Sequence, residues 1–418
     1  MSLPIPTTLG LKKSFGYGDR LGLAAPGHLA AHVKSDFAGI FAQQSIRELD
    51  RTERTPVEVM LAAQTAVAAM ELSEPWGADA DHLKTPADVR LTADAGYTFF
   101  TIDPSAFVAN EADTLGLEEL VSSVSLQESE TIYGGESVES LYLGREFDVS
   151  EHMRLTFDRE QLLRAAVKYG RAIQNVQEMA AHIADACGSR LYEIEVSVDE
   201  TDTPTSTLEH LFFALELKRR GVVVVSLAPR FIGDFEKGVD YRGDLDAFEC
   251  SLEEHIAIAR AYGPYKLSMH SGSDKLSAYP VIGRVCKDLL HVKTAGTSYL
   301  EALRVVCRID PDLFKEIACY SAGRFSQDKA TYHLSTTDQD IANLGGSGTG
   351  KLEQTYLEEN IGRQLLHVTF GSVLTAGQRE SGESLKSAIL QVLLNNDDLY
   401  REVLETHFDR HLNALNAG

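Results

Sequence analysis

The stretch LYEIEVSVDETDTPTSTLEHLFFALELKRRGVVVVSLAP, residues 191–229, decides the fold class. It begins with the apolar run LYEIEVSV and ends with the apolar run VVVVSLAP, and short runs of this kind are typical of buried strands. Between them, STLEHLFFALELKRR from Ser206 has the apolar periodicity of a helix. A strand, a helix and a second strand in succession predict a parallel sheet.

The same alternation extends along most of the first 297 residues. The expected strands are GLAA at 22–25, FAGIFAQ at 37–43, WGADAD at 76–81, YTFFTID at 97–103, LYEIEVSV at 191–198, VVVVSLAP at 222–229, YKLSMH at 265–270 and LLHVKTA at 289–295. Helical segments begin at Pro56, Arg159, Ser206 and Asp246. Eight such units predict an α/β fold, a TIM-like (βα)8 barrel. An open doubly wound sheet is the alternative, because the first two units are short.

Two segments depart from this alternation of strands and helices. Residues 104–157 are acidic and rich in turn-forming residues, which indicates an insertion after the fourth strand. Residues 298–418 have a mainly helical pattern. We therefore expect a barrel over residues 1–297 that includes the insertion, and a helical C-terminal extension over residues 298–418 packed on the barrel.

The charge of the chain limits its partners. It has 39 Lys and Arg residues against 62 Asp and Glu residues, a formal net charge of −23, which opposes binding to nucleic acid or to anionic membranes. The sequence shows no signal-peptide pattern and no apolar run of membrane-spanning length, so we expect a cytoplasmic protein. Its five cysteines form no CxxC pair, which does not favour a structural zinc site.

The sequence GGSGTGK at 345–351 has the glycine and lysine spacing of a phosphate-binding loop. The next residue is Leu352 rather than Ser or Thr, and the preceding segment TTDQDIANL is too polar for a buried strand. The motif therefore indicates a surface loop rather than a nucleotide site.

Polar side chains inside the expected strands carry the functional signal. By the two-residue period of a strand, Glu193, Glu195, Ser197 and then Asp199 share one face, which in a barrel is the interior. Four other strands have similar residues, which concentrate toward the C-terminal ends: Thr101 and Asp103; Asp79, Asp81 and His82; Lys266, Ser268 and His270; His291, which lies early in its strand, and Lys293. Barrels of this class place active sites at the C-terminal ends of their strands.

Carboxylates and imidazoles that converge from separate strands are typical of a divalent-metal site. We predict His82, His270 and His291 as ligands, and Zn, Mn, Fe, Co or Ni as metals that the pattern does not distinguish. Asp81 and Glu195 are the predicted catalytic proton carriers. A single buried histidine is more often structural, and His333 and His367 are secondary candidates in the extension.

Hydroxyl groups and cations follow the later strands. Arg230, Ser271, Ser273, Lys275 and Lys293 are the predicted substrate-binding residues. Fixed donors of this kind suit a polyhydroxylated anion such as a sugar acid. A basic surface for a partner protein explains the hydroxyls less well. The sequence is also compatible with a homo-oligomer.

Five stretches, DADHLKTP at 79–86, YEIEVSVDETDTPT at 192–205, LAPRFIGDFEKGVDY at 227–241, KLSMHSGSDKLSAYP at 266–280 and HVKTAGTSYLEALR at 291–304, together resemble the tagaturonate epimerase family of hexuronate catabolism. The resemblance spans most of the chain, and HSGSDK is its most specific part. It implies interconversion of D-tagaturonate and D-fructuronate with a divalent metal.

The implied chemistry inverts a carbinol carbon that lies β to a ketone. Removal of a proton next to the carbonyl does not invert that carbon, so the resemblance implies a retro-aldol route through an enediolate. A metal-dependent aldolase or ketose isomerase acting on a related sugar acid is one alternative. A non-catalytic sugar-acid binding protein is another, although it does not need His82, His270 and Glu195 together.

Overall fold

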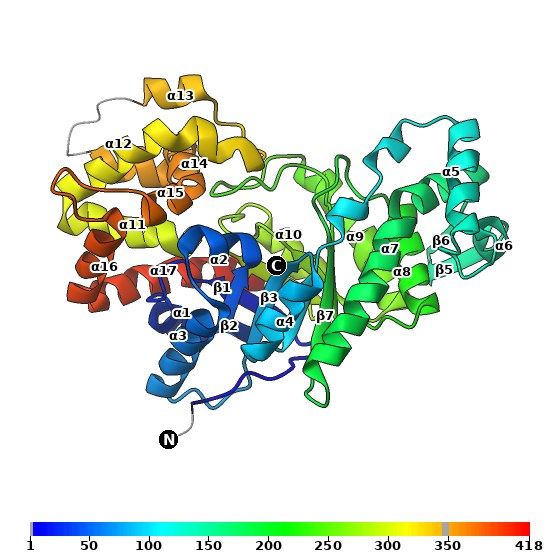
Figure 1. The fold of residues 1–418 in the computed structure, drawn as a ribbon, viewed down its shortest axis with the longest axis horizontal. Helices are drawn as coiled ribbons and strands as arrows, with labels where there is room; N and C mark the ends of the chain where they lie inside the picture. The colour runs from blue at the N-terminus through cyan, green and yellow to red at the C-terminus, as the bar shows by residue number, and fades with distance from the viewer. Residues whose placement is uncertain (1–2, 345–350) are drawn as a thin grey trace.

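The computed structural model describes residues 3–344 and 351–418, and it has a closed barrel of eight parallel strands (Figure 1). The order around the barrel is β1, β10, β9, β8, β7, β4, β3, β2, which returns to β1. The strands are β1 (Ser14–Gly18), β2 (Ala38–Ser45), β3 (Gly77–Leu83), β4 (Phe99–Ile102), β7 (Glu193–Val198), β8 (Ser226–Pro229), β9 (Lys266–Met269) and β10 (Leu290–Thr294). The prediction of a TIM-like (βα)8 barrel is confirmed.

Helices alternate with the strands and cover the barrel. They are α1 (Ala25–His32), α2 (Ile46–Thr52), α3 (Pro56–Ala69), α4 (Pro86–Asp94), α7 (Arg159–Cys187), α8 (Thr207–Arg219), α9 (Leu245–Tyr262) and α10 (Tyr279–Cys286). Several begin where the sequence predicts, because their first turns satisfy the free backbone N–H groups. At α8, for example, the Ser206 hydroxyl accepts from the backbone N–H of Glu209, and the Glu209 carboxylate accepts from that of Ser206.

The insertion after β4 is present. It contains α5 (Leu117–Ser129), α6 (Val138–Tyr142) and a two-stranded antiparallel sheet of β5 (Glu146–Ser150) and β6 (Met153–Thr156). In Figure 1 these elements lie beyond α7 and α8, on the right of the molecule. Short 3₁₀ turns at Ser105–Phe107 and Asn110–Asp113 lead into them.

The C-terminal helices are also present and pack on the opposite side (Figure 1). They are α11 (Thr297–Ile309), α12 (Pro311–Asp328), α13 (Asp338–Asn343), α14 (Asn360–Val368), α15 (Phe370–Thr375), α16 (Leu385–Asn395) and α17 (Asp397–Asn416). A π-helical turn at Gln354–Glu358 precedes α14. Helix α17 contacts α1 and α10, so the end of the chain closes around the barrel.

The first strand was predicted in the wrong place. Residues 22–25 lead into α1, whereas β1 is SFGYG at Ser14–Gly18. Its glycines interrupt the apolar pattern by which a strand is recognised in a sequence. Close packing around β1 accounts for their presence. A Cβ at Gly16 would lie 1.8 Å from Oε1 of Gln43, and one at Gly18 would lie 2.6 Å from the carbonyl oxygen of Thr294. The contact at Gly18 is with the backbone of the segment that ends β10, so no larger side chain fits there, whereas a larger residue at Gly16 would require the Gln43 side chain to move.

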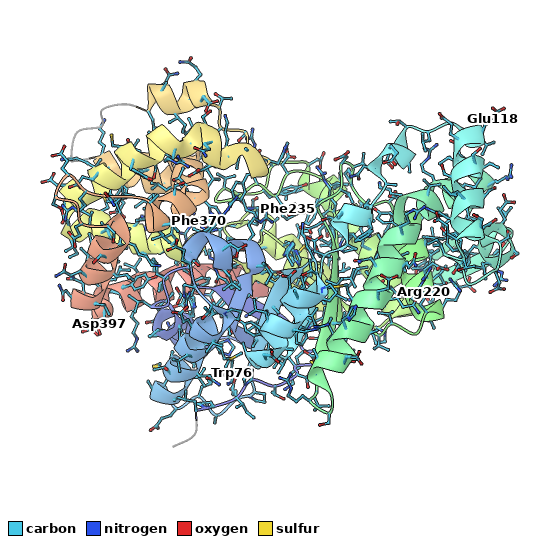
Figure 2. All side chains as sticks on the ribbon, viewed as in Figure 1. Trp76, Glu118, Arg220, Phe235, Phe370 and Asp397 are labelled. Carbon is cyan, nitrogen blue, oxygen red and sulfur yellow. The ribbon has the colours of Figure 1, made fainter. Side chains whose placement is uncertain are left out.

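The two ends of the barrel differ. Trp76, just before β3, is buried at the lower end in Figure 2, whereas Phe235 and Phe370 lie at the upper end.

Residues 345–350 of GGSGTGK lie outside the described residues. No helix within residues 3–344 and 351–418 has the length and apolar character needed to cross a membrane.

Candidate active site

A cavity of about 480 Å³ opens at the C-terminal ends of the barrel strands. Its lining comes from the ends of β2, β3, β7, β8, β9 and β10 and from the C-terminal helical region. The polar lining residues include Asp81, His82, Asp199, Arg230, Lys237, His270, Ser271, Ser273, Lys293 and His367. A volume in this range suits a small-molecule ligand.

At the end of β3, two successive residues both face this cavity. In a regular strand, neighbours point to opposite faces, so Asp81 and His82 would be separated. The pairing of β3 with β4 shifts register between Ala80 and Leu83, and His82 has a left-handed backbone with φ of 55°. This irregularity turns His82 toward Asp81, with Nδ1 of His82 2.8 Å from Oδ1 of Asp81.

The end of β9 has a similar feature. His270 follows the last residue of β9, and Ser271 has a left-handed backbone with φ of 52°. Left-handed backbone is uncommon for residues other than glycine and is concentrated at functional sites. Both strand ends therefore have a left-handed residue, which is His82 itself after β3 and the neighbour of His270 after β9.

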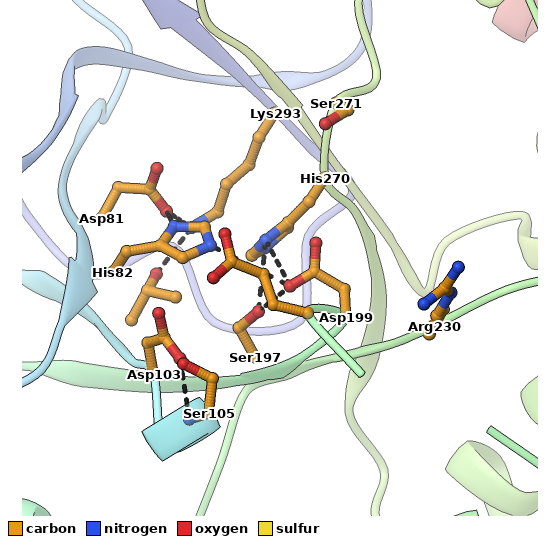
Figure 3. Close-up of polar contacts among 12 residues, drawn as sticks. Asp81, His82, Asp103, Ser105, Ser197, Asp199, Arg230, His270, Ser271 and Lys293 are labelled. Carbon is orange, nitrogen blue, oxygen red and sulfur yellow. Dashed lines mark hydrogen bonds and ion pairs between the residues drawn. The ribbon is translucent and has the colours of Figure 1, made fainter. Parts of the chain in front are cut away.

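These two strand ends bring three candidate metal ligands together. Asp81, His82 and His270 each offer one ligand atom, and the three atoms lie within 4.8 Å of one another. The rings of His82 and His270 are 5.0 Å apart between centroids. Figure 3 shows these side chains converging from different strands, with Lys293 and Asp199 beside them. One carboxylate oxygen and two imidazole nitrogens are a donor set that divalent transition metals accept.

Below this group, Lys293 is surrounded by acidic residues. Its Nζ lies 2.7 Å from Oδ2 of Asp79 and 2.8 Å from both Oδ1 of Asp81 and Oε1 of Glu195. It also donates to Oγ1 of Thr101 at 2.6 Å. Burial would lower the pKa of Lys293, but the three carboxylates outweigh it and hold that pKa above its usual range. Lys293 is thus a fixed cation that compensates the acidic floor of the cavity.

Glu195 lies in this floor and has no solvent exposure. Nε2 of His270 lies 2.7 Å from its Oε1. Burial would raise the pKa of Glu195, but Lys293 and His270 outweigh it and hold the pKa well below its usual range. In contrast, burial and the neighbouring carboxylates of Asp81 and Glu195 raise the pKa of Asp79 to about 7, although Lys293 opposes this.

Asp199 directly follows β7 and is one of the acidic residues after that strand that line the cavity. Its Oδ1 lies 3.5 Å from Nδ1 of His270 and 3.9 Å from Nε2 of His82, and the hydroxyl of Ser197 donates to it. Burial would raise the pKa of Asp199, but His270 and His82 outweigh it and keep this carboxyl ionised. Glu195 therefore supports His270 from below, while Asp199 faces the cavity.

Cations form the other wall of the cavity. Lys237, in the loop after β8, donates to the hydroxyl of Ser271 at 2.5 Å. Burial, followed by the charge of Arg47, lowers the pKa of Lys237. Arg20 also lines the cavity but is held by Glu48 at 2.8 Å, and its guanidinium lies 3.5 Å from the centroid of the Phe370 ring. Lys237 thus places a partly buried ammonium against a hydroxyl of the β9 loop.

The structure brings most of the predicted site residues to one place, with two exceptions. Arg230, Ser271 and Ser273 line the cavity, and Arg230 lies to one side of the ligand cluster in Figure 3. Lys275 is fully buried, and its Nζ donates to the carbonyl oxygens of Glu236, Val239 and Ser273, so it is not placed to contact a substrate.

His291 is the second exception. It pairs in register with Ser268 of β9, two residues before His270, which places it about 7 Å deeper along the barrel. Its Nδ1 lies 2.9 Å from Oγ of Ser14, and burial lowers the pKa of its ring to about 3. His291 is therefore not part of the Asp81–His82–His270 group. His333 and His367 of the extension both line the cavity.

Two residues of the site were missed. Asp199 was visible only as the next residue in the inward series Glu193, Glu195, Ser197, beyond the end of the strand. Lys237 lies in a loop, where strand parity gives no information. The cluster of Asp79, Asp81, Glu195 and Lys293 follows from inward-facing positions on three strands.

Comparison with known proteins decides the family. The model of the tagaturonate epimerase family matches residues 1–415. The chain belongs to this family. It is 42% identical over 410 residues to the tagaturonate/fructuronate epimerase of Thermotoga maritima, covering 98% of this chain and 82% of that protein. It is also similar to the native crystal structure of fructuronate-tagaturonate epimerase from Cohnella laeviribosi, with a TM-score of 0.92 and 38% identity over 99% of this chain and 83% of that one. A glycerol complex of the Cohnella enzyme gives a TM-score of 0.91 at the same identity and coverage.

Proposed function

We propose that this protein is an isomerase that interconverts D-tagaturonate and D-fructuronate by epimerisation and depends on a divalent metal. The substrate pair is supported by the Thermotoga and Cohnella relatives, which are named as epimerases of tagaturonate and fructuronate. The observation that carries the proposal is the convergence of Asp81, His82 and His270 at the mouth of the barrel. Their shared cavity of about 480 Å³ has room for a six-carbon sugar acid.

The donor set fits a divalent cation. Asp81 offers a carboxylate oxygen and the two histidines offer imidazole nitrogens, and Zn, Mn, Fe, Co and Ni all bind such ligands. The surrounding acidic residues favour added positive charge, since Lys293 is already shared by three carboxylates. When bound, the cation would supply Lewis-acid polarisation of the ketone oxygen of the substrate.

The residues of the chain have distinct tasks in this proposal. Lys237 binds the substrate carboxylate, because its ammonium lies in the cavity wall away from the acidic floor. Ser271 hydrogen-bonds substrate hydroxyls. Glu195 holds His270 in orientation through the 2.7 Å contact to Nε2. Lys293 positions Asp81 and Glu195 and does not need to touch the substrate.

Inversion proceeds by cleavage and re-formation of the carbon–carbon bond beside the inverted carbinol. Asp199 takes the proton of the carbinol hydroxyl, the bond breaks, and its electron pair forms the enediolate of the ketone fragment. The other fragment is an aldehyde, which rotates and presents its opposite face. The bond then re-forms, and the new alkoxide takes back the proton that Asp199 holds. No oxidant or reductant is consumed.

A direct assay tests this function. Metal-supplied protein is incubated with D-fructuronate in D₂O, and the products are followed by NMR. We expect D-tagaturonate with no deuterium at the inverted carbon, and loss of turnover in Asp199→Asn. Asp246→Asn is the matched control, because Asp246 is exposed in the first turn of α9.

Each alternative has its own outcome in this assay. Accumulation of cleaved fragments, or of a different ketose, would favour an aldolase or a ketose isomerase. Binding of the sugar acid without conversion under any metal would favour a non-catalytic binding protein. Deuterium at the inverted carbon would rule out the carbon–carbon cleavage route.

A further inference from the structure

A second group of candidate metal ligands lies outside the cavity. Asp274 is in the loop after β9, and His407 and His411 lie one turn apart on α17. Their ligand atoms lie within 4.8 Å of one another, and none of the three lines the cavity. Oδ1 of Asp274 is 3.8 Å from Nε2 of His407 and 3.8 Å from Nε2 of His411. All three side chains are largely buried.

Hydrogen bonds fix the protonation of His411. Its Nδ1 lies 2.8 Å from the carbonyl oxygen of His407, which only accepts, so Nδ1 carries the proton. Its Nε2 accepts from the backbone N–H of Asp274 at 3.0 Å, so Nε2 carries a lone pair. The ring is therefore neutral, and its lone pair is directed toward Asp274.

His407 has the same arrangement. Its Nδ1 lies 3.3 Å from Oε1 of Glu301, a carboxylate that Arg304 holds at 2.7 Å. This places the proton on Nδ1 and leaves the lone pair of Nε2 facing the hydroxyl of Thr297 at 2.5 Å. Histidine ligands of metals typically donate the proton of the other ring nitrogen to a carboxylate or a carbonyl. Both histidines meet this condition.

The carboxylate of Asp274 is also held in place. Arg363 lies 2.8 Å from its Oδ2, and Oγ1 of Thr297 lies 3.2 Å from the same oxygen. Oδ1 is the oxygen that faces both imidazoles. A tetrahedral zinc site with bonds of about 2.0–2.1 Å separates its ligand atoms by about 3.3 Å, so only small movements are required. The cation would replace the hydrogen bonds that Nε2 of each ring now accepts.

We propose that Asp274, His407 and His411 form a second divalent-cation site, which fastens α17 to the loop that follows β9. The hydroxyl of Thr297 is the adjacent fourth donor. Asp274 lies four residues after His270, so the bound cation would tie the C-terminal helix to the segment that carries the active-site histidine. This site does not depend on the substrate or on the proposed activity.

Metal binding to variants separates the two sites. Metal-stripped protein is titrated with Co²⁺ and followed by equilibrium dialysis and by the d–d absorption bands of tetrahedral cobalt. We expect two equivalents for the wild type, one for His82→Gln/His270→Gln, and none when His407→Gln/His411→Gln is added. His152→Gln, in the exposed turn between β5 and β6, is the control for histidine content and should bind as the wild type does.

The cobalt bound by His82→Gln/His270→Gln decides the proposal even if the α17 variants do not fold. This variant should bind one equivalent and melt at a higher temperature when Co²⁺ is added. If it binds no cobalt, or if His407→Gln/His411→Gln still binds two equivalents, the second site does not exist.

Discussion

Nζ of Lys293 lies 2.7 Å from Oδ2 of Asp79 in the closed interior of the barrel. The same ammonium also contacts Asp81 and Glu195, so a single cation on β10 compensates carboxylates from β3 and β7. Water does not screen these charges, because Asp79 and Glu195 have no solvent exposure. The acidic floor of the candidate site is therefore stable only with Lys293 in place.

Replacement of Lys293 by methionine should destabilise the fold strongly. It leaves buried carboxylates without their cation, and breaking a buried ion pair in this way costs about 3–5 kcal/mol. Urea unfolding measures the loss as a lower midpoint. Lys34→Met is the matched control, since Lys34 pairs with Glu405 and Asp409 at the exposed surface, and it should change the midpoint little. Equal losses in the two variants would contradict this account of the floor.

Stability of the metal-free protein should depend on the protonation of His270. Burial lowers the pKa of His270, but Asp199 and Glu195 outweigh it and raise the pKa from 6.5 to about 10. A raised pKa stabilises the folded state below the unfolded value, and that contribution is lost as pH rises through the folded value. In chelator, wild-type stability should therefore fall more between pH 7 and pH 10 than that of His270→Gln. Parallel pH profiles for the two proteins would show that His270 is not protonated in this way.

Loss of the Lys237 ammonium should weaken substrate binding. A hydrogen bond to a charged group contributes about 1.5–3 kcal/mol, so Lys237→Met should raise KM for the sugar acid roughly 10- to 100-fold. The effect on kcat should be smaller, because Lys237 lies away from the acidic floor. Lys218→Met, exposed near the end of α8, serves as control. An unchanged KM in Lys237→Met would exclude it as the carboxylate-binding residue.

His291→Gln should leave metal binding at the cavity unchanged. The ring of His291 is hydrogen-bonded to Ser14 well below the ligand cluster, so it is too far from the cation to bind it. Metal content after dialysis should match the wild type, whereas His82→Gln should lose about one equivalent. Loss of metal in His291→Gln, with the fold intact by circular dichroism, would show that His291 is a metal ligand, as the sequence predicts.

The sequence predicts the strands that follow ordinary packing rules and misses the one that does not. β7 has β-branched residues on one face and acidic residues on the other, so its inward positions can be assigned by parity. β1 is not recognised, because Gly18 is required by close contact with the backbone at the end of β10, which is distant in the sequence. Long-range packing of this kind leaves no local pattern.

For the candidate site too, the sequence predicts some features and not others. Convergence of Asp81, Glu195 and His270 follows from strand ends in a closed barrel. The inward turn of His82 depends on a register shift and a left-handed residue, which the letters DADH do not reveal. The depth of His291 depends on its register with Ser268, and Lys275 is held by carbonyl oxygens of the neighbouring loops. The sequence shows neither the register nor these contacts.

The most direct test of the central claim is the metal dependence of epimerisation. Chelator-treated protein is assayed for conversion of D-fructuronate to D-tagaturonate before and after addition of Zn, Mn, Fe, Co or Ni, with His270→Ala and His291→Gln in parallel. We predict activity that returns with metal in the wild type and in His291→Gln and that stays absent in His270→Ala. Full activity in the stripped wild-type protein, or metal-restored activity in His270→Ala, would contradict the proposed site.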